Sequence, residues 1–470
     1  MARVLFLQNF WFEFLGTMYL SAILKQDGHQ VDLFIEGGES DLMASVAAFK
    51  PDLVGMYCTT GDHIWALRTA ARVKTVSGAR IILGGPHPTF FPEIIEDTHI
   101  DYVCRGEGEE AVRELARALD GGLPDSAIRG LWTKSDGTVH RNELAPPLRD
   151  LDELPLPDRD IYYKRYELLR ENPSKHFITG RGCPFTCSFC CNKAYNELYR
   201  NCGPIVRRHA PERVITEILA VADKYPLKSV RFDDEVFLLK PSWILAFLEM
   251  YRQRVNIPFT CLIRADLTTE ENISAMSRAG CYAAYFGIES GNDRLRQEVL
   301  KKTITRDAIM RTAHYLHKYG IAIGTFNMLG IPGETLDEAM ETVAINQRIR
   351  TEYPWASIVQ PYPRTELLEI ARERGVLEED LRPEDFSASY FNRSVIKNPQ
   401  QDQLINLHRL FYIAVKAPPL LPMIRLLIML PPNKLFDLLF SASFGYRYIK
   451  TYRVPVLRLL KAARYLKDRF

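Results

Sequence analysis

The sequence predicts an α/β protein with two alternating strand–helix regions and a mainly helical C-terminal region. Short apolar runs alternate with amphipathic stretches over residues 1–120, and the same alternation returns over residues 173–375. Helical periodicity dominates residues 376–470. Strands that alternate with helices at this spacing form parallel sheets. A chain of 470 residues has room for about three domains of ordinary size.

The composition is that of an ordinary globular chain. Hydrophobic residues make up 47% and charged residues 25%, and 60 Lys and Arg against 58 Asp and Glu give a net charge of +2. This balance does not predict a nucleic-acid partner. Because the nine cysteines are an odd number and no signal peptide is recognisable, we expect a reduced, cytoplasmic chain. No uncharged apolar run is long enough for a membrane-spanning helix.

Five apolar runs predict a doubly wound parallel sheet in the first region. They lie at residues 4–7, 31–35, 53–57, 80–83 and 102–104. Ligands of such sheets bind beyond the carboxyl ends of the strands. Unusual residues, with glycines and small hydroxyl residues among them, follow three of these strands. They either make room for a bulky ligand or form tight turns. They are Cys58, Thr59 and Thr60, then Gly84, Gly85, Pro86 and His87, then Gly106 and Glu107.

Residues 121–172 are polar and rich in proline, and we expect a linker that contains a small hairpin. Residues 135–138 read Ser-Asp-Gly-Thr, which is typical of a hairpin turn. Residues 151–157 read as an extended connector.

Six strand–helix units predict an incomplete barrel of the triosephosphate isomerase type in residues 173–375. The strands are expected at residues 176–179, 229–233, 259–263, 282–288, 321–328 and 356–360. The active site of such a barrel lies at the carboxyl ends of its strands, and distinctive residues follow all six. Among them are Asp233, Asp234 and Glu235, then Arg264, then Glu289 and Ser290, then Asn327. A single carboxylate after a strand could be a helix cap. Distinctive residues after all six strands indicate one shared site.

The loop after the first of these strands carries three closely spaced cysteines. They are Cys183, Cys187 and Cys190. Three thiolates can bind three irons of a four-iron cluster and leave the fourth iron open to a small molecule. A structural zinc site needs a fourth ligand, and Cys191 is poorly placed because it is adjacent to Cys190. A closed cluster would need a fourth cysteine, for which Cys202 is the near candidate. The spacing favours the open cluster.

The barrel region resembles the radical S-adenosylmethionine (SAM) enzymes. Their signature, Cys-x-x-x-Cys-x-aromatic-Cys, is matched by the three cysteines and Phe189. The resemblance implies a 4Fe–4S cluster whose open iron binds SAM, cleavage of SAM to a 5'-deoxyadenosyl radical, and a flavodoxin- or ferredoxin-type electron donor. The implied SAM-binding residues are Phe189, Asp233, Asp234, Glu235, Arg264, Glu289, Ser290 and Asn327. Which of the three consecutive carboxylates contacts SAM stays open.

The first region resembles the cobalamin-binding, Rossmann-like domain that precedes this barrel in the B12-dependent subfamily. The likeness rests on residues 84–89 and 106–109, and it implies that the strand-end residues named above bind cobalamin. The stretch around His29 nearly matches a cobalt-ligating motif, Asp-x-His-x-x-Gly. However, His29 precedes the second strand and so lies at the opposite edge of the sheet, while His63 has the wrong spacing. We therefore expect no histidine of this domain to bind cobalt.

The resemblance implies a cobalamin-dependent methyltransferase that acts on an unactivated carbon. Two alternatives remain: a non-methylating relative that catalyses cyclisation, oxidation or ring contraction, and an iron–sulfur redox protein without turnover. We expect a small or lipid-like substrate, whose identity the sequence does not indicate. No catalytic residue is predicted beyond the cluster and the SAM site.

The C-terminal end is basic and apolar. Residues 440–470 contain eight Lys or Arg and one acidic residue, interleaved with Leu, Phe and Tyr. This pattern suits peripheral contact of residues 416–470 with an anionic membrane surface. It equally suits a helical cap over the barrel with a solvated basic face.

Overall fold

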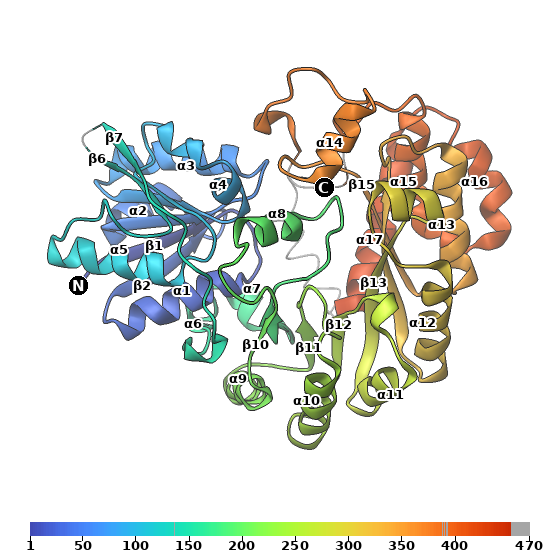
Figure 1. Cartoon of the computed structure of the whole chain (residues 1–470), viewed down its shortest axis with the longest axis horizontal. Coiled ribbons are helices and arrows are strands. Elements are labelled where there is room, and N and C mark those ends of the chain that lie inside the picture. The colour runs from blue at the N-terminus through green and yellow to red at the C-terminus, as the bar shows by residue number, and fades with distance from the viewer. Residues whose placement is uncertain (136, 388, 390, 392, 453–470) are drawn as a thin grey trace. The chain divides into compact units, whose positions relative to one another are not determined.

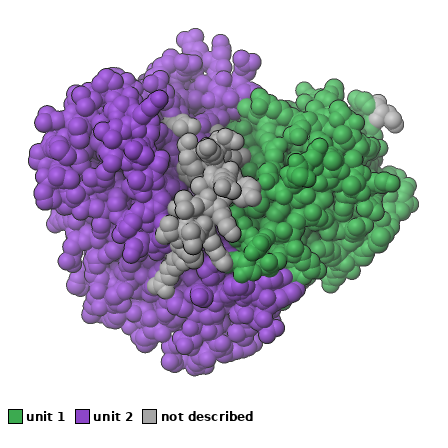
Figure 2. Space-filling model, turned by 180° about the vertical axis from the view of Figure 1, so that it is seen from behind, with its two compact units in different colours: residues 1–171, 195–204 green, residues 172–194, 205–470 purple. Residues whose placement is uncertain are grey.

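The computed structural model describes residues 1–135, 137–387, 389, 391 and 393–452 (Figure 1). The chain forms two compact units (Figure 2). The first contains residues 1–171 and 195–204, and the second contains residues 172–194 and the described residues from 205 onward. Each unit is built on its own parallel sheet.

The sheet of the first unit has the strand order β2-β1-β3-β4-β5-β6-β7. Its first five strands are parallel: β1 (Arg3–Gln8), β2 (Gln30–Ile35), β3 (Leu53–Tyr57), β4 (Arg80–Gly84) and β5 (Tyr102–Cys104). They confirm the five expected strands. Consecutive residues of each strand are buried, because helices cover both faces of the sheet, and this explains why the strands read as continuous apolar runs.

Five helices connect these strands: α1 (Leu15–Gln26), α2 (Leu42–Phe49), α3 (His63–Val76), α4 (Pro86–Phe90) and α5 (Glu109–Gly121). α2 packs against α3, and α1 packs against α5. The start of α2 is set by Asp41, whose carboxylate accepts hydrogen bonds from the N–H groups of Met43 and Ala44.

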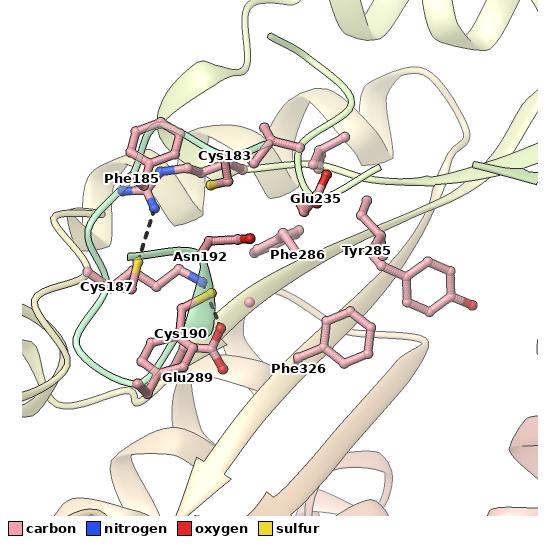
Figure 3. A pocket seen from close by; sticks show the side chains of 17 residues that line it. Cys183, Phe185, Cys187, Cys190, Asn192, Glu235, Tyr285, Phe286, Glu289 and Phe326 are labelled. Carbon is pink, nitrogen blue, oxygen red and sulfur yellow. Dashed lines mark hydrogen bonds and ion pairs between the residues drawn. The ribbon is translucent and has the colours of Figure 1, made fainter. Parts of the chain in front are cut away.

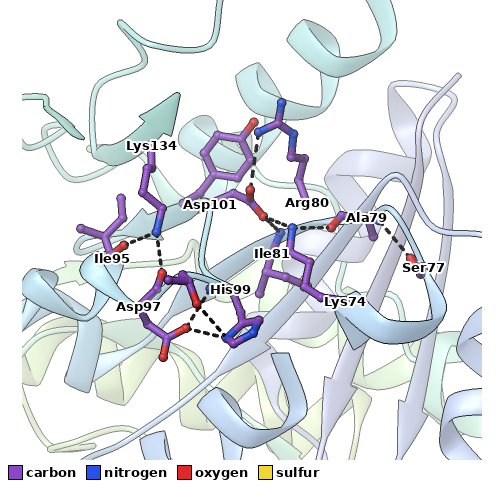
Figure 4. A network of polar contacts seen from close by, with 12 residues as sticks. Lys74, Ser77, Ala79, Arg80, Ile81, Ile95, Asp97, His99, Asp101 and Lys134 are labelled. Carbon is purple, nitrogen blue, oxygen red and sulfur yellow. Dashed lines mark hydrogen bonds and ion pairs between the residues drawn. The ribbon is translucent and has the colours of Figure 1, made fainter. Parts of the chain in front are cut away.

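The expected hairpin extends this sheet. β6 (Leu131–Ser135) pairs antiparallel with both β5 and β7 (Thr138–Arg141). A polar network at the amino end of β5 holds the hairpin to the rest of the sheet (Figure 4). Asp101 accepts hydrogen bonds from Lys74 Nζ and the Ile81 N–H, both at 2.7 Å, and its carbonyl accepts one from the Lys134 N–H at 2.9 Å. This network lies at the edge opposite the expected ligand site.

The remainder of the expected linker also belongs to the first unit. Two buried tyrosines, Tyr162 and Tyr163, lie on its short helix α6 (Asp160–Tyr163), and a third, Tyr166, directly precedes the short helix α7 (Glu167–Arg170). The Tyr162 hydroxyl donates a hydrogen bond to Gln8 Oε1 at 2.8 Å, and the Tyr166 hydroxyl accepts one from the Ile35 N–H at 2.7 Å. Residues 121–171 thus lie within a compact unit, in contrast to the expected linker. The reason is that hydrogen bonds to distant strand ends hold them there.

The sheet of the second unit is open and wholly parallel, with the order β15-β14-β13-β12-β11-β8. Its strands are β8 (Ser174–Phe177), β11 (Ser229–Phe232), β12 (Phe259–Leu262), β13 (Cys281–Glu289), β14 (Ala322–Leu329) and β15 (Tyr353–Ile358). Each strand pairs with the next in the chain, which confirms the incomplete barrel. The last strand begins three residues earlier than expected. Pro354 is tolerated there because β15 is an edge strand.

Helices cover the outside of this barrel: α9 (Pro211–Lys224), α10 (Pro241–Arg254), α11 (Glu270–Arg278), α12 (Arg306–Lys318), α13 (Leu336–Arg348) and α14 (Glu366–Glu373). They bury an apolar core with the outward side chains of the strands, including Phe177, Phe232 and Phe259. A two-stranded ribbon, β9 (Gly180–Arg181) with β10 (Arg207–Arg208), closes the base of the cysteine loop.

The expected helical C-terminal region is confirmed in the described residues by α15 (Gln401–Lys416), α16 (Leu421–Leu427) and α17 (Lys434–Tyr452). α15 packs on α13 and β15, so this region completes the second unit. None of the described helices combines the length and the apolar character that crossing a membrane requires. Residues 453–470, part of the expected membrane contact, lie outside the described residues.

Candidate active site

A cavity of about 190 Å³ lies at the carboxyl ends of the barrel strands in the second unit (Figure 3). Its wall combines the cysteine loop with residues that follow three different strands. Of the predicted site residues, it contains Cys183, Cys187, Phe189, Cys190, Glu235, Arg264 and Glu289. Further residues line the cavity and were not among the predicted site residues. Among them are Phe185, Asn192, Tyr285, Phe286, Gly287 and Lys302.

The cysteine loop is held in place by Ser188, which is fully buried. Its N–H donates a hydrogen bond to the carbonyl of Leu300 at 2.9 Å, its hydroxyl donates to Val299 at 2.7 Å, and its carbonyl accepts from the Leu367 N–H at 2.8 Å. These three hydrogen bonds to the backbone of distant segments hold Ser188, which lies between Cys187 and Cys190, in place. The three thiols consequently face one cavity.

The three thiols differ in acidity. Burial raises the pKa of Cys183 to about 11 and also raises that of Cys187, whereas a hydrogen bond with the Cys191 thiol lowers the pKa of Cys190 to about 7. Cysteine binds metals as the thiolate. Arg264 Nη1, 3.7 Å from the Sγ of Cys187, favours that form.

These residues fit a four-iron cluster. Among the residues that the structure describes, no three His, Cys, Asp or Glu side chains converge as the ligands of a single metal ion would. A cluster does not require such convergence, because each thiolate binds a different iron. Three cysteine side chains on one cavity wall are the donor set that the cluster needs.

Arg264 is rigidly positioned at the cavity. Its guanidinium carbon lies 3.6 Å from the centroid of the Phe185 ring, and Nε forms an ion pair of 2.8 Å with Asp266. A further hydrogen bond of 3.3 Å joins it to Thr303. The result is a fixed cationic group, suited to a carboxylate ligand.

Glu289 and Lys302 form an ion pair of 2.7 Å in the cavity wall, and both side chains are buried. Glu289 has a φ of 62°, in the left-handed region that few residues other than glycine adopt. Gly287 provides the necessary space, since a Cβ atom there would meet both the Glu289 carboxylate and the Lys302 ammonium group. Lys302 lies in a loop without a recognisable motif, so no sequence signal pointed to it.

The three consecutive carboxylates have different environments. Asp233 forms 2.5 Å ion pairs with His176 and Arg231; burial opposes ionisation, but these partners lower its pKa to about 2. Asp234 is buried, and burial raises its pKa. It accepts hydrogen bonds from the Thr179 N–H and hydroxyl and pairs with Arg208 at 2.8 Å. Only Glu235 of the three lines the cavity, where reduced solvation raises its pKa.

Two other residues expected to bind SAM lie outside the cavity wall. Ser290 is fully buried, and its hydroxyl accepts a hydrogen bond from the Asn292 N–H at 3.2 Å. Asn327 donates to the Trp355 carbonyl at 2.8 Å and accepts from Asn346 Nδ2 at 2.8 Å. Asp233, Asp234, Ser290 and Asn327 thus lie outside the cavity wall, and each has hydrogen-bond or ion-pair partners within the barrel. Their expected contact with SAM stays a prediction.

The residues expected to bind cobalamin gather at the carboxyl edge of β3, β4 and β5 in the first unit. The carbonyl of Cys58 accepts a hydrogen bond from the His87 N–H at 3.2 Å, and the Thr60 hydroxyl lies 3.1 Å from His87 Nδ1. Gly85 has a φ of 102°, and a Cβ there would meet the Tyr57 ring. Thr59 instead donates to Asp62 at 2.8 Å and caps the turn before α3.

The histidines of this edge stack on one another. The ring of His87 lies 3.9 Å from that of His63 and 5.1 Å from that of Phe91, and it is buried. Burial, together with His63, lowers the pKa of His87 to about 3, so its ring is neutral. His29 lies at the amino end of β2, where its Nδ1 accepts a hydrogen bond from the Ala2 N–H at 3.2 Å.

Gly106 and Glu107 are covered by Tyr199, from the segment of residues 195–204 that packs with the first unit. The Glu107 N–H donates a hydrogen bond to the Tyr199 hydroxyl at 2.8 Å, and its carboxylate accepts one from the Leu148 N–H at 3.0 Å. A Cβ on Gly106 would collide with that hydroxyl. Contacts within the first unit therefore occupy this part of the expected cobalamin site.

The loop after β1 adds an apolar surface that the sequence analysis missed. Phe12 is 41% exposed, Tyr57 at the end of β3 is 44% exposed, and the Tyr57 ring lies 5.0 Å from that of Phe14. Four aromatic residues among residues 10–14 were the signal in the sequence.

Comparisons with known proteins agree with both units. A family model described as a B12 binding domain matches residues 12–116, and one described as the radical SAM superfamily matches residues 177–344. An uncharacterized methyltransferase of Pyrococcus horikoshii is 33% identical over 373 residues, which cover 77% of this chain and 79% of that protein. The chain belongs to the cobalamin-dependent radical SAM enzymes. Its cofactors are a 4Fe–4S cluster, SAM and cobalamin.

Two further matches of this radical SAM enzyme have lower sequence identity. The cytidylyl-2-hydroxyethylphosphonate methyltransferase of Streptomyces wedmorensis is 24% identical over 390 residues, covering 69% of this chain and 71% of that protein. The structure of OxsB with aqua-cobalamin and SAM bound has a TM-score of 0.68 at 16% identity, covering 99% of this chain and 75% of OxsB. This likeness confirms the fold.

Proposed function

We propose that this radical SAM enzyme is a methyltransferase that methylates an unactivated carbon of its substrate. The observation that carries the proposal is one cavity that unites three cysteines with Glu235, Arg264 and the Glu289–Lys302 pair, in a chain with a B12-binding domain. The methyltransferase names of the relatives from Pyrococcus horikoshii and Streptomyces wedmorensis support methyl transfer. When bound, the cluster and SAM supply a 5'-deoxyadenosyl radical, and cobalamin supplies the methyl group.

The charges around the cavity match the charges of SAM. Glu235 would hold the amino group, and Arg264, fixed by Phe185 and Asp266, would hold the carboxylate. Glu289 would accept hydrogen bonds from the ribose hydroxyls. Lys302 would orient the Glu289 carboxylate through their ion pair. The three cysteines would hold the cluster.

In the first unit, cobalamin would lie at the carboxyl edge of the sheet. Gly85 lets the Tyr57 ring lie close to the backbone, and the exposed rings of Phe12 and Tyr57 would contact the apolar face of the macrocycle. Thr60, Pro86 and His87 would form the wall beside it.

Aromatic residues in the barrel favour an apolar, lipid-like or aromatic substrate. Phe326 is 38% exposed in the cavity, and its ring lies 6.0 Å from that of Tyr285. Trp355 is the partner of Phe326 on β15, where its ring packs against Phe444 and Arg447 of α17. A flavodoxin- or ferredoxin-type protein would supply the electrons for turnover.

A non-methylating reaction is the second candidate. The anaerobic magnesium-protoporphyrin IX monomethyl ester cyclase of Rubrivivax gelatinosus is 26% identical over 368 residues, covering 75% of this chain. The name of that protein favours cyclisation as the alternative.

The test is anaerobic incubation of the reconstituted protein with SAM that carries a deuterated methyl group, methylcobalamin, a reductant and an extract of small molecules and lipids. We expect 5'-deoxyadenosine, S-adenosylhomocysteine and a deuterated product, identified by mass spectrometry. Deoxyadenosine together with an altered product that has gained no methyl group would favour the second candidate. Absence of deoxyadenosine would contradict both.

A further inference from the structure

Residues 420–438 form a row of exposed apolar side chains on the second unit, here called the C-terminal ridge. Seven of the sixteen exposed large apolar side chains of the described chain lie in this short stretch. The seven are Leu420, Met423, Leu426, Met429, Leu430, Leu435 and Leu438. Leu426 is 75% exposed and Leu438 is 65% exposed. Single exposed leucines are ordinary, but such a concentration marks an interaction surface.

The ridge is not a part of the core that has failed to pack. Ile424 and Ile428 on the other face of α16, and Phe436 on α17, are buried in the cluster that α15 forms with the barrel. Asn406 of α15 donates hydrogen bonds to the carbonyls of Ile428, at 3.2 Å, and Leu430, at 2.6 Å, which fixes the turn between these helices. Figure 1 shows α16 on the outer side of the second unit. The exposed face is therefore a second face of well-packed helices.

The charge around the ridge is positive. In the described part of this region, residues 416–450 contain five Lys or Arg and one acidic residue. Lys416, Lys434 and Lys450 are exposed, as is Arg425, which lies 3.9 Å from the exposed Asp337. The acidic residue nearest in the chain, Asp437, is neutralised by Arg409 at 2.8 Å. Apolar side chains between basic ones complement a surface of acyl chains and anionic headgroups.

We propose that the C-terminal ridge docks on the surface of an anionic lipid bilayer. The leucine and methionine side chains enter the headgroup region, and the lysines and Arg425 remain at the phosphates. A protein partner of ordinary composition would not explain the excess of basic residues beside an apolar row. The docking is independent of the reaction that the barrel catalyses, because none of the seven residues lines the cavity.

The test is sedimentation of the full chain with phosphatidylcholine vesicles, with and without an anionic phospholipid. We expect tighter binding to the anionic vesicles, weakened by salt. The double variant Leu426→Glu/Leu438→Glu should bind at least about tenfold more weakly. Leu123→Glu is the matched control, because Leu123 is 64% exposed but lies in the first unit; this variant should bind like the unmodified protein.

A second variant tests the charge separately. Arg425→Glu/Lys434→Glu should lose the preference for anionic vesicles, with an unchanged thermal unfolding midpoint. Equal vesicle binding by the unmodified protein and the Leu426→Glu/Leu438→Glu variant would overturn the proposal. A second result would also overturn the proposal: in analytical ultracentrifugation the unmodified protein is a dimer, and the Leu426→Glu/Leu438→Glu variant is a monomer that still binds vesicles. The ridge would then join two copies of the chain.

Discussion

Lys302 Nζ lies 2.7 Å from Glu289 Oε1, and the two buried side chains share the cavity wall above Gly287. A buried pair of this kind costs solvation, and its members depend on each other. The pair thereby holds the Glu289 carboxylate at a position where a polar ligand can meet it.

Replacement of Lys302 by Met should destabilise the protein by roughly 3–5 kcal/mol, because it leaves the Glu289 carboxylate buried without its partner. Thermal or urea unfolding of the apo protein would measure this. Lys302→Arg should lose less stability, since it keeps the positive charge beside Glu289. The double variant Glu289→Gln/Lys302→Met should recover stability without recovering SAM binding. If it recovers both, the pair has only a structural role.

Cys183→Ala should abolish cluster assembly and SAM cleavage, whereas Cys191→Ala should leave both largely intact. The reason is that Cys183 lines the cavity while Cys191 is exposed outside it. Iron and sulfide content after anaerobic reconstitution measures the first effect, and release of 5'-deoxyadenosine measures the second. Loss of iron in Cys191→Ala as severe as in Cys183→Ala would contradict the three-cysteine site.

Glu235→Gln should weaken SAM binding by about tenfold or more, because it removes the anionic group facing the cavity. Asp234→Asn should act on stability instead, since it breaks the buried pair with Arg208. Calorimetric titration with SAM and thermal unfolding separate the two effects. The reverse pattern, with SAM affinity lost in Asp234→Asn alone, would show that the barrel rearranges when SAM binds.

The first unit should lose stability in acid through His87. Burial lowers its pKa in the folded chain to about 3, below the ordinary histidine pKa of 6.5, so the unfolded chain binds the proton first. The contribution is complete above pH 6.5 and is lost as the pH falls toward 3. The loss amounts to roughly 5 kcal/mol. Urea unfolding at several pH values measures it, and His87→Gln should flatten the profile. An equally steep acid profile in this variant would assign the effect to other groups.

Histidine coupling should be absent from the Co(II) spectrum of the cobalamin-bound protein. His29 lies at the amino end of β2, hydrogen-bonded to Ala2, and His63 is stacked on His87. Paramagnetic resonance of the unmodified protein, His29→Ala and His63→Ala should therefore agree. Nitrogen hyperfine splitting that disappears in either variant would identify that histidine as the cobalt ligand.

Much of the fold and the centre of the site were predictable from local patterns. The apolar runs of β1 to β5 and of most barrel strands lie where periodicity placed them, and the spacing of Cys183, Cys187 and Cys190 brought the cysteines to one cavity. The strand ends also predicted Glu235, Arg264 and Glu289. These features depend on neighbours in the chain, so the sequence carries them directly.

Other features depend on residues that meet only in the folded chain. Asp233, Asp234 and Glu235 are adjacent in sequence, yet His176, Arg231 and Arg208 bind the first two and leave Glu235 at the cavity. The hairpin of β6 and β7 joins the sheet through β5.

The sequence by itself thus determined the two-sheet architecture and the family, and it predicts Cys183, Cys187 and Cys190 as the cluster ligands. Only the tertiary structure decided which carboxylate faces the cavity, and that Lys302 stands beside Glu289. The physical reason is that strand periodicity and cysteine spacing are local, whereas the pairing of buried charges is set by packing between distant segments.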